Sequence, residues 1–172
     1  MSQEPMQVSR IEEDKARFYA NYKSGVSWFF WLAVISLVNI IIRITNPESQ
    51  IRFAVGLSIT NWLEHNPLPF LTVLTPKKLA FGVGIVFIVL LVLLGLMARK
   101  RNKPAYLTGM IIYALDIIPA FLIKDVYSIV FHLIVLGFLI WGFVHLLKLE
   151  KLEAEYPDET EPEVIVIGPD KP

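Results

Sequence analysis

The stretch YALDIIPAFLIKDVYSIVFH, residues 113–132, decides the fold, because only Lys124 and Asp125 separate its two apolar runs. Each run extends to about the length that crosses a membrane, so the two are predicted to form a tight antiparallel helical hairpin. The first run carries Asp116 and the second carries His132. An ionisable group at the centre of a span costs roughly 2.5 to 3.5 kcal/mol, so each of these residues needs a partner or a function.

Asp116 and His132 are predicted to lie at the same depth. Asp116 lies eight residues before Lys124, and His132 lies seven residues after Asp125. At 1.5 Å per residue, both are roughly 10 to 12 Å from the turn. Helical spacing brings further polar residues onto the same faces. The predicted intramembrane cluster consists of Asn39, Asp116 and His132, with Ser36, Tyr113, Asp125 and Ser128 as neighbours.

The composition indicates that much of the chain lies in lipid. Of the 172 residues, 55% are hydrophobic, and the mean hydropathy is +0.55. The 16 basic residues balance the 16 acidic ones, so no net charge favours nucleic acid as a partner. The sequence contains no cysteine, which excludes disulfides, thiolate metal sites and a cysteine nucleophile.

Four stretches approach the roughly 20 apolar residues that cross the hydrocarbon core. The predicted spans are residues 26–44, 79–97, 106–123 and 126–147. A fifth run, residues 51–64, is too short and too polar to cross. We therefore expect an all-α membrane protein, in which residues 25–148 form a four-helix transmembrane bundle with a short extracytoplasmic interfacial or re-entrant helix.

The distribution of Lys and Arg predicts that both termini are cytoplasmic. On the side of the termini lie Arg10, Lys15, Arg17, Lys23, Arg99, Lys100, Arg101, Lys103, Lys148 and Lys151. The opposite side holds only Arg43, Arg52, Lys77, Lys78 and Lys124. If residues 51–64 also crossed, the basic loop at 99–103 would change sides and this bias would weaken.

The two ends of the chain are predicted to lie outside the bilayer. Residues 1–24 contain Ser9 and Glu12 at capping-box spacing, and they are interpreted as an amphipathic helix lying under the cytoplasmic leaflet. Residues 149–172 are acidic and rich in proline, so they are expected to form a disordered cytoplasmic tail.

Three functional interpretations of the polar cluster remain open. The leading one is a non-enzymatic structural or partner-binding component, in which polar side chains bond across helices. The alternative is a small proton-linked transporter or permease, in which Asp116 and His132 change protonation and Pro119 kinks the helix one turn away. A membrane-embedded enzyme is the third.

No cofactor, metal or catalytic set is predicted. One Asp and one His do not complete a zinc or iron site, and the sequence contains no HExxH, P-loop or GxSxG motif. The expected partners are the lipid bilayer and a membrane protein or a second copy of the chain.

Several runs resemble a family of small bacterial integral membrane proteins with four spans and no established activity. They are SGVSWFFWLAVISLVN at 24–39, FAVGLSIT at 53–60, YALD at 113–116 and FHLIVLGFLIWG at 131–142. The resemblance, over roughly residues 24–143, implies a bacterial inner membrane protein. Because Gly56 to Thr60 falls on the same side as the polar cluster, we also consider that it dips toward Asn39, Asp116 and His132 as a lid or plug.

Overall fold

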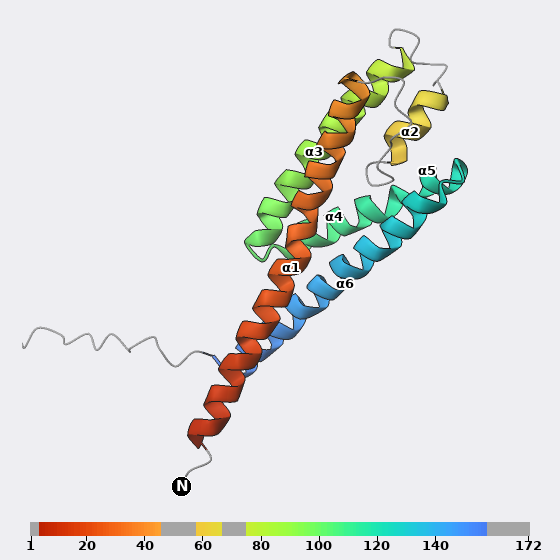
Figure 1. Ribbon diagram of the computed structural model, residues 1–172. Coiled ribbons are helices and arrows are strands. Elements are labelled where there is room, and N and C mark those ends of the chain that lie inside the picture. The colour runs from red at the N-terminus through yellow and green to blue at the C-terminus, as the bar shows by residue number, and fades with distance from the viewer. Residues whose placement is uncertain (1–3, 46–57, 67–74, 158–172) are drawn as a thin grey trace, which may run out of the picture.

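The computed structural model describes residues 4–45, 58–66 and 75–157, and the regular structure within these ranges is helical. Its elements are α1 (Glu4–Thr45), α2 (Ser58–His65), α3 (Pro76–Arg99), α4 (Lys103–Leu115), α5 (Ile117–Leu122) and α6 (Val126–Glu155) (Figure 1). Four segments of this part are long and apolar enough to cross a membrane, and they come from α1, α3, α4 with α5, and α6. The predicted all-α, four-helix membrane fold is therefore confirmed.

The surface of the bundle is apolar where lipid would contact it. On α3, Val86, Val89 and Leu93 form a stripe at helical spacing, with 64, 52 and 52% of their surface exposed. On α6, Leu133 and Trp141 are 55 and 52% exposed. Exposing such stripes to water is unfavourable in free energy, whereas lipid tails are as apolar as the side chains and contact them without that penalty. These exposed faces agree with a multi-pass membrane protein.

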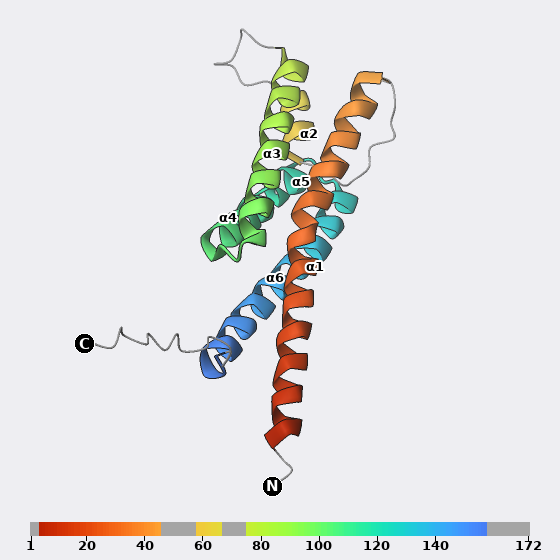
Figure 2. The same ribbon diagram turned by 90° about the vertical axis from the view of Figure 1, so that its left-hand side faces the viewer.

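The first span does not begin with a separate surface helix, because α1 is one continuous helix of 42 residues (Figures 1 and 2). At 1.5 Å per residue it is about 63 Å long, roughly twice the thickness of the hydrocarbon core. The prediction of a helix lying under the leaflet over residues 1–24 is therefore wrong for residues 4–24. Within α1 no proline follows Pro5, and its one glycine, Gly25, costs only about 1 kcal/mol.

The extended part of α1 is held by contacts with other helices. The Phe18 and His145 rings lie 5.8 Å apart, between α1 and α6. One turn further along α1, the Tyr22 hydroxyl donates a hydrogen bond to the Ala98 carbonyl near the end of α3. These contacts explain why the charged N-terminal segment continues the axis of the span.

The last helix also extends beyond its predicted end. α6 reaches Glu155, so the prediction of disorder for residues 149–172 is wrong for 149–155, and residues 158–172 lie outside the described part. Two ion pairs fasten this extension to the corner between α3 and α4. Arg101 Nη1 lies 2.8 Å from Glu153 Oε2, and Lys103 Nζ lies 2.6 Å from Glu150 Oε2. Three of the eight acidic residues assigned to a tail, Glu150, Glu153 and Glu155, are thereby part of a helix.

α1 and α6 cross where two glycines meet. A Cβ added to Gly25 would lie 2.6 Å from the Gly142 Cα and 2.5 Å from the Tyr106 hydroxyl. A Cβ added to Gly142 would lie 2.7 Å from the Gly25 Cα. Both distances are shorter than a carbon atom tolerates, so the crossing requires glycine at both positions. The crossing lies in the core that also contains Phe29 and Leu139.

The two tight turns after α3 and after α5 have the same backbone conformation. Arg101 has φ 59° and Lys124 has φ 56°, in the left-handed region that usually holds glycine. At the second corner the N–H of Lys124 donates to the Phe121 carbonyl and that of Asp125 to the Ala120 carbonyl, which is the Schellman pattern. Asp125 then caps α6 immediately, so three residues, Ile123 to Asp125, join the two helices in the predicted tight hairpin.

Candidate functional site

Asp116 lies at a break in the third span. It ends α4 and begins α5, with φ −67° and ψ −9°, and its N–H donates to the Ile112 carbonyl over 3.2 Å. Pro119 has no N–H to donate to the Leu115 carbonyl, so the regular ladder cannot continue through this turn. The predicted kink is thus a short interruption that leaves the Asp116 side chain at the junction of the two helical pieces.

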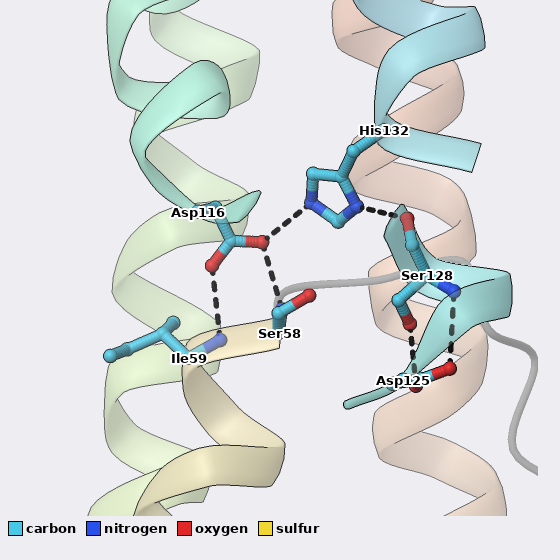
Figure 3. A network of polar contacts seen from close by, with 6 residues as sticks. All are labelled: Ser58, Ile59, Asp116, Asp125, Ser128 and His132. Atoms are coloured by element: carbon cyan, nitrogen blue, oxygen red, sulfur yellow. Dashed lines mark hydrogen bonds and ion pairs between the residues drawn. The ribbon is translucent and has the colours of Figure 1, made fainter. Parts of the chain in front are cut away.

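The Asp116 carboxylate binds the first backbone N–H groups of α2 (Figure 3). Its Oδ2 accepts from Ser58 N over 2.8 Å, and its Oδ1 accepts from Ile59 N over 3.0 Å. The first N–H groups of a helix have no partner within the helix, and the positive end of the helix dipole favours an anion there. α2 has no acidic residue in its own first turn. Asp116 therefore caps α2 from another part of the chain.

His132 completes the partners of this carboxylate. Its Nε2 lies 3.0 Å from Asp116 Oδ2, and its Nδ1 lies 2.7 Å from the Ser128 carbonyl oxygen. A carbonyl only accepts, so Nδ1 carries a proton and donates it. The contact between Nε2 and Oδ2 then holds one further proton, carried by His132 or by Asp116. In either case the pair is neutral overall, which lowers the cost of burying it.

A second polar contact orients the start of α6 and, through it, His132. Asp125 Oδ1 accepts from the Ser128 N–H over 3.1 Å, and its Oδ2 accepts from the Ser128 hydroxyl over 2.7 Å (Figure 3). This is an N-cap of α6. Because the Ser128 carbonyl accepts from His132, the cap fixes the turn that holds the imidazole.

The pair is closed off from its surroundings. The side chains of His132 and Asp116 are 2 and 1% exposed. The Tyr113 ring stacks on the His132 ring, with centroids 4.7 Å apart and planes inclined by 7°. α2 lies between α3 and α5 (Figure 1), where its first turn covers the carboxylate. Every polar atom of the pair has a partner within the protein.

The structure brings together most of the cluster predicted from the sequence. Asp116, His132 and Tyr113 are in contact, and Asp125 and Ser128 lie one contact further along α6. On α1, Ser36 is buried and Asn39 is half-buried. The expectation that Asn39 joins the pair stays a prediction. The first two N–H groups of α2 also bind the carboxylate.

The N–H groups of Ser58 and Ile59 are the functional groups that the residue pattern did not predict. Backbone donors carry no residue signal, and only the position of the 51–64 run suggested that it approaches the cluster. The idea that Gly56 to Thr60 dips toward the pair agrees with the structure for Ser58 and Ile59. Gly56 and the residue after it lie outside the described part.

The arrangement suits an internal anchor or a proton site better than a metal site. In the part of the chain that the structure describes, no group of three or more His, Cys, Asp or Glu side chains is placed to hold a metal ion. His145 lies apart from the cluster and accepts from the Trp141 indole N–H over 3.0 Å. In comparisons with protein-family models, curated proteins and solved structures, nothing matches this chain. The functional argument therefore rests on geometry.

Proposed function

We propose that this chain is a non-enzymatic component of the bacterial inner membrane that acts by binding a membrane protein or a second copy of itself. The observation that carries the proposal is the closed state of the Asp116 and His132 pair. Their side chains are 1 and 2% exposed, and their polar atoms bond to one another and to the peptide groups of Ser58, Ile59 and Ser128. Such bonds between helices contribute about 0.6 to 2 kcal/mol each and need no ligand.

The lengths of α1 and α6 support a role in binding a partner. α1 has 42 residues and α6 has 30, whereas about 20 residues cross the hydrocarbon core. Both helices therefore extend past the membrane, and they extend at the same end of the molecule (Figures 1 and 2). Phe18 and His145 contact each other at the base of these extensions, and below this contact the two helices diverge (Figure 2). Helical surfaces that extend outside the bilayer are accessible to another protein.

The positions of cationic residues support placing this end of the molecule in the cytoplasm. The basic corner between α3 and α4 lies beside the extensions, because Arg101 contacts Glu153 of α6 and also lies over the Tyr19 ring of α1. The start of α1, the corner between α3 and α4 and the end of α6 carry most of the Lys and Arg residues, and they therefore lie at the same end of the molecule. The positive-inside rule assigns such an end to the cytoplasm. The resemblance to small four-span bacterial proteins supports the assignment to a bacterial inner membrane.

Flux and stability measurements together test this proposal. The purified full chain is reconstituted in proteoliposomes that contain a pH-sensitive dye, and its unfolding is followed by heating in detergent. We expect no proton flux above that of empty vesicles, and we expect Asp116→Asn to lower the Tm. Proton flux above empty vesicles that Asp116→Asn abolishes while the Tm is retained would overturn the proposal.

A proton-linked transporter is the second candidate, and one observation favours it. The pair shares a single proton between His132 Nε2 and Asp116 Oδ2, and movement of that proton requires no change in net charge at the site. The proteoliposome experiment distinguishes the two candidates, because only transport depends on the ability of Asp116 to exchange a proton with both sides of the membrane.

A further inference from the structure

Two hydroxyl groups beside the Asp116 and His132 pair have unmet hydrogen-bonding capacity. Ser58 Oγ and Tyr113 Oη are buried, and within the described structure neither has a hydrogen-bond partner. The two residues are 4 and 3% exposed. A hydroxyl offers one donor and two lone pairs, and nearly all buried polar groups in proteins bond either to protein or to ordered water. Two such groups, on residues that contact the same pair, therefore point to bound water.

The two hydroxyls border the same pair from different helices. Ser58 donates its N–H to Asp116 Oδ2, so its hydroxyl belongs to the residue that covers the carboxylate. Figure 3 shows this hydroxyl directed toward the α6 side of the cluster. Tyr113 lies one helical turn before Asp116 on α4, and its ring stacks on His132. The unpaired groups are thus contributed by α2 and α4 and flank the only ion pair that the described part holds within the bundle.

The Asp116 carboxylate retains capacity for one more donor. Its two oxygens offer about four lone-pair positions. Three are used by the Ser58 N–H, the Ile59 N–H and His132. A molecule that donates to the fourth position and accepts from a hydroxyl would satisfy the remaining polar atoms of the site.

We propose that this junction of α2, α4 and α6 is a binding site for internal water, held by Ser58 Oγ, Tyr113 Oη and the fourth lone pair of Asp116. Water is the smallest molecule that both donates and accepts, and a buried water typically makes two to four hydrogen bonds. A charged ligand fits less well, because the pair is already neutral and an added ion would be buried without a partner. The site goes beyond the proposed function and is compatible with both candidates.

Water-selective nuclear Overhauser spectra of the full chain in nanodiscs test the proposal. We expect a long-lived water to give cross-peaks to the Ser58 amide proton and to the Tyr113 ring protons. Ser58→Ala and Tyr113→Phe, which remove only a hydroxyl, should weaken both cross-peaks. The wild-type spectrum is decisive by itself: without these cross-peaks, the proposal is overturned, even if a variant fails to fold.

Thermal unfolding of the same variants supplies an independent reading. If Tyr113 Oη bonds to water, Tyr113→Phe should lower the Tm. If the same water also bonds to Ser58 Oγ, the double variant of Tyr113→Phe and Ser58→Ala should lower the Tm by less than the sum of the two single decreases. If the hydroxyl has no partner, its removal relieves a buried polar atom and the Tm is unchanged or rises. An unchanged or raised Tm for Tyr113→Phe also overturns the proposal. Tyr127→Phe is the matched control. Tyr127 is 80% exposed, so the Tm of this variant should stay at the wild-type value.

Discussion

The Asp116 carboxylate lies 2.8 Å from the backbone N–H of Ser58, a residue 58 positions earlier in the chain. This contact makes a break in one membrane span the cap of a short helix from another part of the sequence. α2 has only 8 residues, too few to be stable alone. Its place in the bundle depends on this cap and on apolar contacts such as that of the buried Leu63.

Loss of the His132 imidazole should strongly destabilise the bundle. His132→Leu keeps a similar volume but leaves the Asp116 carboxylate buried without its counter-charge. Breaking a buried pair in this way costs about 3 to 5 kcal/mol. The free energy of unfolding in mixed detergent, followed by circular dichroism, measures the loss. The double variant Asp116→Leu with His132→Leu should lose less than the two single variants combined.

His145→Leu is the matched control on the same helix. His145 is also mostly buried; in the described structure its ring nitrogens hydrogen-bond to Trp141 of its own helix, and its ring packs against Phe18. Loss of neutral hydrogen bonds of this kind costs about 1 kcal/mol each. If His132→Leu were no more destabilising than His145→Leu, the pair would not stabilise the fold as described.

Adding even a methyl group at the crossing of α1 and α6 should destabilise the protein. In Gly142→Ala the new Cβ would lie 2.5 Å from the Tyr106 hydroxyl and 2.7 Å from the Gly25 Cα. Overpacking of this kind costs about 1 to 3 kcal/mol. Gly137→Ala is the control on the same helix, because nothing lies within 4 Å of its added Cβ. That variant should be neutral or gain up to about 1 kcal/mol from helix propensity. Equal Tm values for the two variants would refute the close crossing.

The turn before α6 should become more stable when its left-handed residue is glycine. Lys124 has φ 56°, which costs a residue with a Cβ roughly 1 kcal/mol relative to glycine. Lys124→Gly should therefore raise the free energy of unfolding by up to about 1 kcal/mol, whereas Lys124→Val should lower it. Lys77→Gly, in the first turn of α3, is the control and should only destabilise. Destabilisation by Lys124→Gly would contradict the described turn.

The hairpin and its polar pair could be predicted because they follow from distances along the chain. Two residues between two apolar runs define a turn, and equal distances from that turn place Asp116 and His132 at one depth. Hydrophobic length likewise predicted the four spans. These properties are local or depend on a single short connection, so one sequence contains them.

The cap on α2 and the helix crossing could not be predicted, because they depend on how distant helices pack. The donors to Asp116 are peptide groups, which every residue except proline carries. Gly25 and Gly142 resemble other span glycines until their helices are placed in contact. The continuous α1 was missed because its first residues have the composition of a surface helix, and only contacts such as that between Tyr22 and Ala98 keep them in line with the span.

The central claim is that Asp116 holds α2 in the bundle, and labelling of a single thiol tests it most directly. The natural sequence has no cysteine, so Leu63→Cys places one reporter on the buried face of α2. Asp116→Asn keeps the size of the side chain but loses its charge and one acceptor. Hydrogen bonds to charged groups contribute about 1.5 to 3 kcal/mol, which corresponds to roughly 10- to 100-fold faster labelling when α2 opens more often.

Leu91→Cys, in the core of α3, separates local release of α2 from general loosening, since Leu91 is 1% exposed. The rates of reaction with N-ethylmaleimide are compared for both reporters, with Asp116 retained and with Asp116→Asn. The account predicts that Asp116→Asn accelerates labelling of Leu63→Cys at least about tenfold while Leu91→Cys stays protected. An unchanged rate at Leu63→Cys, or an equal increase at both reporters, would contradict it.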